Sequence, residues 1–167
     1  MKFINVSTPH IYVLLKTVKQ KLEDKRADID TLINRYFSNE KLKNIWIGDW
    51  VSLSGYPCIT LEPTGEDYQY TATNWTVEKE FVTTVNFYIQ TPSTEVAIEC
   101  ISDIGELIHN ILNDPKTVAW DVLDDKTGNK VGTVWESHAS AKAYEYKEEG
   151  IRKVSITYTM QFMKVQC

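Results

Sequence analysis

The sequence predicts an α+β fold, a mostly antiparallel β-sheet with a long amphipathic helix packed on one face and an N-terminal helical region. Three observations lead to this prediction. A long strand pattern over residues 77–90 ends at Thr91-Pro92 and turns into a helical stripe. A strong hairpin signal, Glu148-Glu149-Gly150, lies between two further strand patterns. The chain has 167 residues, of which 43% are hydrophobic and 25% charged, which suits a single globular domain over residues 1–167.

The strand pattern is dense in β-branched and aromatic residues, and its side chains divide between the two faces of the pleat. Only Thr83 interrupts the apolar face. The apolar face contains Phe81, Val85, Phe87 and Ile89, and the other face contains Thr84, Asn86 and Gln90.

The helix is predicted over Glu95–Leu112, after a Pro92 that cannot continue the strand. Ser93 or Thr94 can cap it, and Glu95 suits its positive end. Apolar residues recur at helical spacing and should face the sheet. They are Ala97, Ile101, Ile104, Ile108 and Ile111, with Ile98, Leu107 and Leu112 widening the stripe.

The N-terminal third also has a helical pattern. Thr8-Pro9 gives a cap and a proline start, and apolar stripes follow over residues 11–22 and 29–36. The charged stretch Glu23–Asp28 is either an exposed turn of one helix or a break between two. Residues 1–8 are expected to form an N-terminal arm.

The middle of the chain holds a strand and a polar excursion. Tyr56–Pro63 reads as a strand bounded by prolines, with Tyr56–Leu61 in the sheet. Residues 64–76 are rich in Thr, Tyr and Gly and form either a projecting β-hairpin or a loop that meets a partner.

The C-terminal half should complete the sheet. Val118–Leu123 and Val131–Trp135 flank a turn, and Ala139–Tyr146 and Ile151–Met163 flank the hairpin signal. In the last strand apolar and polar residues alternate, so that strand should be half buried.

Charge and cysteine content exclude several classes of function. The formal net charge is −5, and the basic residues of Lys16–Arg26 are interrupted by acids, as on a solvated helix face. Tight nucleic-acid binding is therefore disfavoured. The widely spaced Cys58, Cys100 and Cys167 predict neither a zinc site nor a disulfide framework, and the first two read as small core residues.

We find no constellation of residues that predicts catalysis, a cofactor or a metal. His10, His109 and His138 are scattered, and the neighbours Ser137 and His138 would point to opposite faces of a strand. Phosphate-loop, dinucleotide and nucleophile-elbow motifs are absent from the sequence. No apolar run is long enough to cross a membrane and no signal peptide is evident, so we expect residence in the cytoplasm.

Aromatic residues outside the core pattern are the remaining unusual feature. Trp46 and Trp50 are expected to fold onto the core. Tyr68, Tyr70 and Trp75, on the polar excursion, are the candidate interface with another subunit or a partner.

The order of these elements resembles the tail terminator (tail completion) proteins of long-tailed bacteriophages and related neck proteins. The resemblance lies in the strand start Tyr56-Pro57-Cys58-Ile59, the strand Glu80–Gln90 leading into the helix Ile98–Leu112, and a Gly150-Ile151-Arg152 return within the closing hairpin Tyr144–Phe162. It covers most of the chain as a layout.

The resemblance implies a non-enzymatic structural protein of the virion tail or neck, assembled in the host cytoplasm. Its subunits would form a ring with copies of themselves, typically a hexamer. The ring would cap the tail tube beside tube or sheath proteins, stop elongation and join the head–tail connector proteins. Genome DNA would pass through the lumen without specific binding, and the net acidity fits such a channel. The alternatives are another head-completion connector of the same particle, or an unrelated small enzyme or ligand-binding domain.

Overall fold

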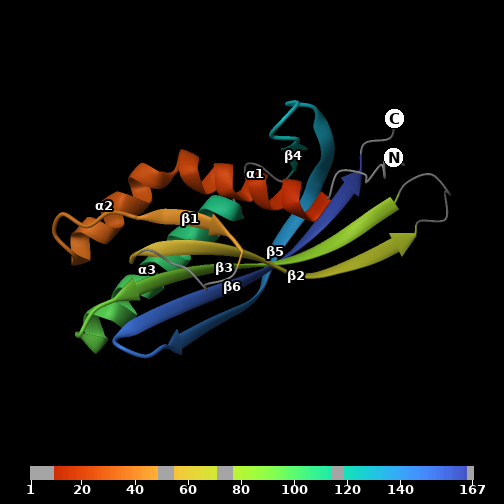
Figure 1. Cartoon of the computed structure of the whole chain (residues 1–167). Helices are drawn as coiled ribbons and strands as arrows, with labels where there is room; N and C mark the ends of the chain where they lie inside the picture. Colours follow the sequence, from red (N-terminus) through yellow and green to blue (C-terminus); the bar gives the residue numbers. More distant parts are fainter. Residues whose placement is uncertain (1–9, 49–54, 71–76, 114–118, 165–167) are drawn as a thin grey trace, which may run out of the picture.

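Three helices pack on one face of a six-stranded mixed sheet, so the α+β prediction is confirmed (Figure 1). The computed structural model describes residues 10–48, 55–70, 77–113 and 119–164. The predicted N-terminal arm lies outside these residues. The helices are α1 (His10–Asp24), α2 (Arg26–Tyr36) and α3 (Thr94–Leu112), and the strands are β1 (Asn44–Ile47), β2 (Cys58–Tyr70), β3 (Val77–Gln90), β4 (Trp120–Leu123), β5 (Lys130–Tyr146) and β6 (Ile151–Lys164).

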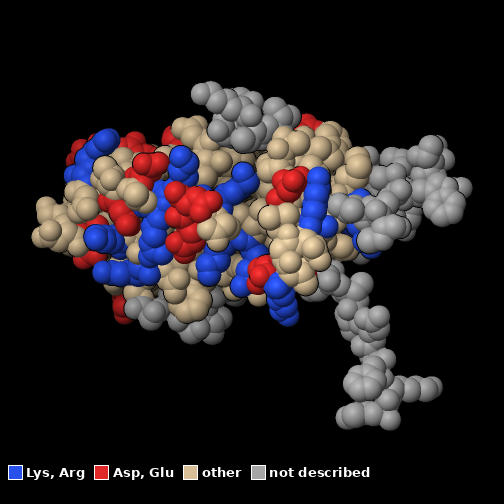
Figure 2. All heavy atoms as spheres, turned by 90° about the horizontal axis from the view of Figure 1, so that it is seen from above, with Lys and Arg blue, Asp and Glu red and all other residues tan. Residues whose placement is uncertain are grey.

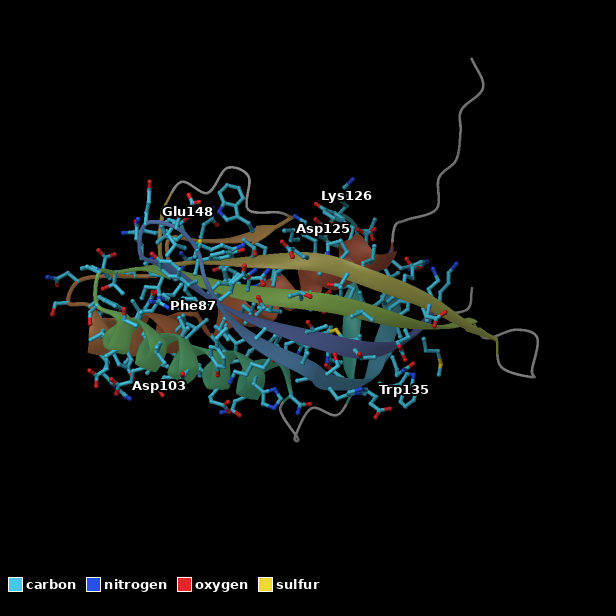
Figure 3. The ribbon with its side chains drawn as sticks, turned by 90° about the horizontal axis from the view of Figure 1, so that it is seen from below. Phe87, Asp103, Asp125, Lys126, Trp135 and Glu148 are labelled. Carbon is cyan, nitrogen blue, oxygen red and sulfur yellow. The ribbon has the colours of Figure 1, made fainter. Side chains whose placement is uncertain are left out.

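The strand order is β1-β2-β3-β6-β5-β4, and every neighbouring pair is antiparallel except β1 and β2. Strand β1 was not predicted as a strand, because Gly48 follows only four strand residues. The two long hairpins, β2–β3 and β5–β6, form the centre of the sheet. Beyond the helices, β2 and β3 continue as a projecting hairpin (Figures 1 and 3).

The described part of the polar excursion, residues 64–70, belongs to a β-hairpin, which is one of the two predicted alternatives. Residues 64–70 belong to β2 and pair with β3 as far as Tyr70 opposite Val77. Strand β2 therefore starts two residues later than predicted and extends well past Pro63. A register shift between Pro63 and Gly65 marks a bulge, which places an extra residue in β2 and increases the local twist.

The core lies between the helices and one face of the sheet. The apolar face predicted for the long strand is buried there, together with the Thr83 that interrupts it. Figure 3 shows Phe87 between the sheet and α3. The alternating strand β6 contributes Val154, Ile156, Tyr158, Met160 and Phe162 to the same core.

Helix α3 buries the stripe that its spacing predicts, with one exception. Ile101, Ile104 and Ile108 are all at most 2% exposed. Ile98 is 49% exposed, so the prediction that it widens the stripe is wrong. It lies one residue after the buried Ala97, which rotates it about 100° around the helix and away from the sheet.

The N-terminal region forms two helices, α1 and α2, because the chain turns at Lys25. Arg26 donates to the carbonyl oxygen of Leu42 (2.6 Å), which ties the start of α2 to the segment before β1. At the other end of α2, the Tyr36 hydroxyl donates to the Asp103 carboxylate on α3. This hydrogen bond to a carboxylate is the main reason why the pKa of Tyr36 is raised to about 12.

Gly132 of β5 lies where a side chain would strike the core. A Cβ there would overlap the Phe162 ring and lie 2.5 Å from the carbonyl oxygen of Met163. We expect Gly132→Ala to lower the free energy of unfolding by about 1–3 kcal/mol, because an overpacked core must distort its neighbours. Gly65→Ala, in β2, is the matched control, since its Cβ would lie 3.7 Å from the nearest atom, in Val82. Equal melting temperatures for the two variants would contradict this packing.

Candidate functional site

The three histidines, which could support catalysis, lie on three different elements, α1, α3 and β5. The ring of His10 lies 5.6 Å from that of Phe162, and burial is the main cause that lowers its pKa, followed by Lys79 and Lys164. His109 lies in the last turn of α3 and stacks on Tyr158. His138 is exposed on β5. Ser137 pairs with Met160 and His138 with Thr159, so they point to opposite faces.

Two cysteines and the turn residue Asp124 also have structural roles in the described part of the chain. Cys58 and Cys100 are fully buried, as predicted, and burial raises the pKa of each thiol to about 12. Asp124 accepts hydrogen bonds from the backbone N–H of Lys126 and the hydroxyl of Thr127, so it stabilises its own turn. No group of three or more His, Cys, Asp or Glu in the described residues could hold a metal ion. No helix in the described residues is both long enough and apolar enough to cross a membrane.

Trp46 does not fold onto the core, so the prediction for this residue is wrong. It lies on β1 and is 39% exposed, because its neighbour Ile45 takes the core side of the strand. Tyr68 and Tyr70 belong to the projecting part of β2, opposite Lys79 and Val77. Trp50 and Trp75 lie outside the described residues.

The face of the sheet away from the helices carries a network of hydroxyl and amide groups. The Asn86 amide donates to Thr60 (3.0 Å), and the Ser155 hydroxyl donates to Asn86 (2.6 Å), so one hydrogen-bonded row crosses β2, β3 and β6. A second row joins the hydroxyls of Thr64, Thr84 and Thr157. We call this face of β2, β3, β6 and residues 136–146 of β5 the open face, because no described helix covers it. Thr60, Asn86 and Tyr88 on this face are nonetheless at most 2% exposed.

The open face is acidic. Where side chains are described, it carries five carboxylates and one ammonium group. The carboxylates belong to Glu62, Asp67, Glu80, Glu136 and Glu145, and the ammonium group to Lys153. Lys153 is paired with Glu145 at 3.1 Å, which leaves the face with a net negative charge.

Cations of the same strands lie toward the helices. Lys142 binds Glu106 of α3 at 2.5 Å, Lys79 binds Glu66 at 2.9 Å, and Arg152 donates to Thr94. The surface seen from above Figure 1 mixes the two signs, with Lys and Arg interspersed among Asp and Glu (Figure 2). The charge of the sheet is thus divided between its two faces.

The sheet also has two open edges at opposite ends. Strand β1 covers β2 only along Cys58–Leu61, so residues 62–70 of β2 have no strand on their outer side among the described residues. Strand β4 covers β5 only along residues 130–134, so residues 135–146 are open in the same sense. We call these the β2 edge and the β5 edge. Trp135 projects from the β5 edge in Figure 3.

The hydrogen-bond pattern identifies which backbone groups the β5 edge presents. The Lys147 N–H donates to the carbonyl of Ile151 (2.7 Å), so Lys147 faces β6. In an antiparallel ladder the facing direction alternates. The N–H and C=O groups of Lys142, Tyr144 and Tyr146 therefore point away from the sheet.

The same argument applies to the β2 edge. The carbonyl of Leu61 accepts from Gly48 on the β1 side, so Val85, opposite Leu61, does not bond to β2. The even-numbered residues of β3 form the backbone hydrogen bonds to β2, and past the bulge they pair with Gly65, Asp67 and Gln69. The backbone groups of Glu66, Tyr68 and Tyr70 consequently point outward.

No protein-family model matches the chain, and neither does any curated protein. A solved structure does: the chain is similar to one from the "Virion of native gene transfer agent (GTA) particle", with a TM-score of 0.57 and 9% sequence identity. The match covers 94% of this chain and 99% of the other. At this identity the similarity shows a shared fold.

Proposed function

We propose that the chain is a non-enzymatic structural subunit of a phage-like virion, a tail terminator that closes into a ring, caps the tail tube and joins it to the head connector. The observation that carries the proposal is the division of the sheet into a helix-covered face and an acidic, hydroxyl-rich open face. In a ring with the helices outside, the open face would line the lumen.

Such a lumen suits the passage of DNA. Five carboxylates and one paired ammonium group on each subunit give a negative wall, which repels phosphate and keeps the genome from adhering. Partly exposed hydroxyl groups, such as those of Thr84 and Thr157, add polar surface to this wall. The fold shared with a chain of a gene transfer agent virion is consistent with a place in such a particle.

Tyr68, Tyr70 and Trp75 remain our candidates for one side of the contact between subunits. Tyr68 and Tyr70 lie on the β2 edge, in a hairpin that projects beyond the helices (Figure 1). A projecting strand can reach a neighbouring subunit without disturbing the core of its own.

The proposal is tested by deleting the gene in the phage or particle that encodes it and measuring tails by electron microscopy. We expect tail tubes that grow past their normal length and do not join heads, because nothing ends polymerisation. Expression of the wild-type chain from a plasmid should restore both. A gene position next to sheath or tube genes would give independent support.

Two other outcomes would contradict the terminator role. Tails of normal length that stay unattached to filled heads would indicate a head-completion connector. Normal, infectious particles would exclude a structural role and leave an enzyme or a ligand-binding domain.

A further inference from the structure

We propose that the β5 edge of one copy of this chain pairs with the β2 edge of the next copy, so that the sheets of successive subunits join into one continuous antiparallel sheet. The proposal rests on the proposed function, because it names the contact that would close the ring. The partner is a second copy of the same chain, and the two halves of the contact are different surfaces.

The strand directions fit such a junction. Strand β2 is antiparallel to β3, β3 to β6 and β6 to β5, so β2 and β5 run in opposite directions. When β5 of one subunit lies beside β2 of the next, the alternation continues across the boundary. An antiparallel ladder can then form without either subunit turning over, which is what a head-to-tail contact requires.

The two edges have similar lengths but lie toward opposite ends of the sheet, since Tyr68 is level with Val134 and Tyr144 with Ile59 through the registers of β3 and β6. They can meet in a closed ring only if the strands are inclined to the ring axis, as they are in a β-barrel. The β2 edge spans residues 62–70 and the β5 edge residues 135–146, and each has three alternate outward-facing backbone positions at its C-terminal end. They are Glu66, Tyr68 and Tyr70 on one strand and Lys142, Tyr144 and Tyr146 on the other. Strands β1 and β4 block the opposite ends of these two edges, which limits how far the strands can slide.

These outward positions are on corresponding faces of the sheet. Lys142 reaches Glu106 of α3, so the outward residues of the β5 edge lie on the helix side. Glu66 pairs in register with the buried Phe81, so its position is on the helix side too. Residues hydrogen-bonded across an antiparallel ladder have their side chains on the same face. The junction would therefore keep the helices of all subunits on one side.

Exposed aromatics and charge favour the pairing. Trp135, Tyr144 and Tyr146 are 38%, 53% and 57% exposed on the β5 edge. Arg152 lies 4.4 Å from the Tyr146 ring, which adds a cation on the helix side. The β2 edge has Glu62, Glu66 and Asp67 and no Lys or Arg. The β5 edge carries Glu136 and Glu145 on the open face, so the complementary charge is confined to the helix side, where Lys142 and Arg152 would meet Glu66.

Bulges supply curvature at both edges. Register shifts occur between Pro63 and Gly65 in β2, and between Val134 and Glu136 and between Ala139 and Ala141 in β5. A bulge bends its strand and raises its twist, and a sheet must curve to close on itself. Bulges also discourage flat stacking of edges with unrelated chains.

The test blocks each edge separately with proline, which has no N–H to donate. Tyr144→Pro removes an outward N–H of the β5 edge, and Tyr68→Pro removes one of the β2 edge. The matched controls Tyr144→Ala and Tyr68→Ala remove the same side chains and keep the N–H groups. Sedimentation velocity at up to about 1 mM subunit then measures self-association, which reveals an interface even with a Kd in that range.

We expect the wild-type chain to form rings or their open fragments, and each proline variant to associate at least about tenfold more weakly than its alanine control. Since each variant keeps one intact edge, an equimolar mixture of the two proline variants should form a dimer and stop there. Each variant should stay folded, because the N–H group that it loses points outward and forms no hydrogen bond within the described part of its own subunit. Circular dichroism melts check this.

Three results would overturn the proposal: a wild-type chain that stays monomeric throughout this range, proline variants that still form rings, or a mixture of the two that forms no dimer. None of these decides whether the protein ends tails. A chain that assembles through these edges while the gene deletion leaves tail length unchanged would keep the interface and remove the terminator role.

Discussion

Ile104→Asp is expected to lower the free energy of unfolding by about 3 kcal/mol or more. Ile104 is fully buried on the face of α3 that packs against the sheet, and it belongs to the large core cluster between the helices and the sheet. A carboxylate there would lose its hydration without gaining a partner, or would have to take up a proton to avoid the cost. Urea denaturation followed by circular dichroism measures the change.

Ile98→Asp is the matched control, because it makes the same substitution on the same helix at a side chain that is 49% exposed. We expect it to change stability by no more than about 0.5 kcal/mol. If both variants unfold at the same urea concentration as the wild type, α3 does not pack on the sheet through this stripe.

The elements that local periodicity determines could be predicted from the sequence. The stripe of α3 and the alternation of β6 both repeat over many residues, so a single misplaced residue such as Ile98 does not hide them. The hairpin at Glu148-Glu149-Gly150 follows from its turn residues, and Glu149 and Gly150 indeed have positive φ angles of 58° and 74°. These features depend on neighbours in sequence.

Features that depend on distant partners could not be predicted in this way. Strand β1 has only four residues, and its parallel pairing with β2 is decided by the position of Ile45 over the core. Residues 64–70 have a turn-like composition, yet they form a strand because β3 offers a long ladder opposite them. For such segments tertiary contacts outweigh local propensity.

The candidate site shows the same limit more strongly. The sequence singled out Tyr68 and Tyr70 by their aromatic character in a polar stretch, but nothing local indicates that β5 has an open edge with Tyr144 and Tyr146 exposed. The β5 edge is open because its neighbour β4 has only four residues. Which strand lies beside β5 is decided by the tertiary fold and not by the local sequence. The net charge of −5 does not predict the acidic open face either. That face arises because successive side chains of a strand point to opposite faces of the sheet.

Phe162→Ala is expected to cost about 3–5 kcal/mol of unfolding free energy, the range for removing a buried aromatic ring from a core. Phe162 is fully buried near the end of β6 and meets Phe81 edge to face, with ring centroids 5.3 Å apart. The lost ring takes this aromatic pair with it and leaves a cavity beside Gly132, which has no side chain to fill it. Met163→Ala, at the next position and 39% exposed, should cost far less.

A double substitution separates the cavity from a general weakness of the strand. Gly132→Ala is unfavourable in the wild type because its Cβ would overlap the Phe162 ring. In the Phe162→Ala background that Cβ would enter the vacated space, although the Met163 carbonyl oxygen at 2.5 Å still opposes it. The two costs should therefore sum to more than the cost of the double variant, by about 0.5–3 kcal/mol as for residues in contact. Chemical denaturation of the four proteins measures this coupling, and strictly additive costs would mean that Gly132 and Phe162 do not share the space described.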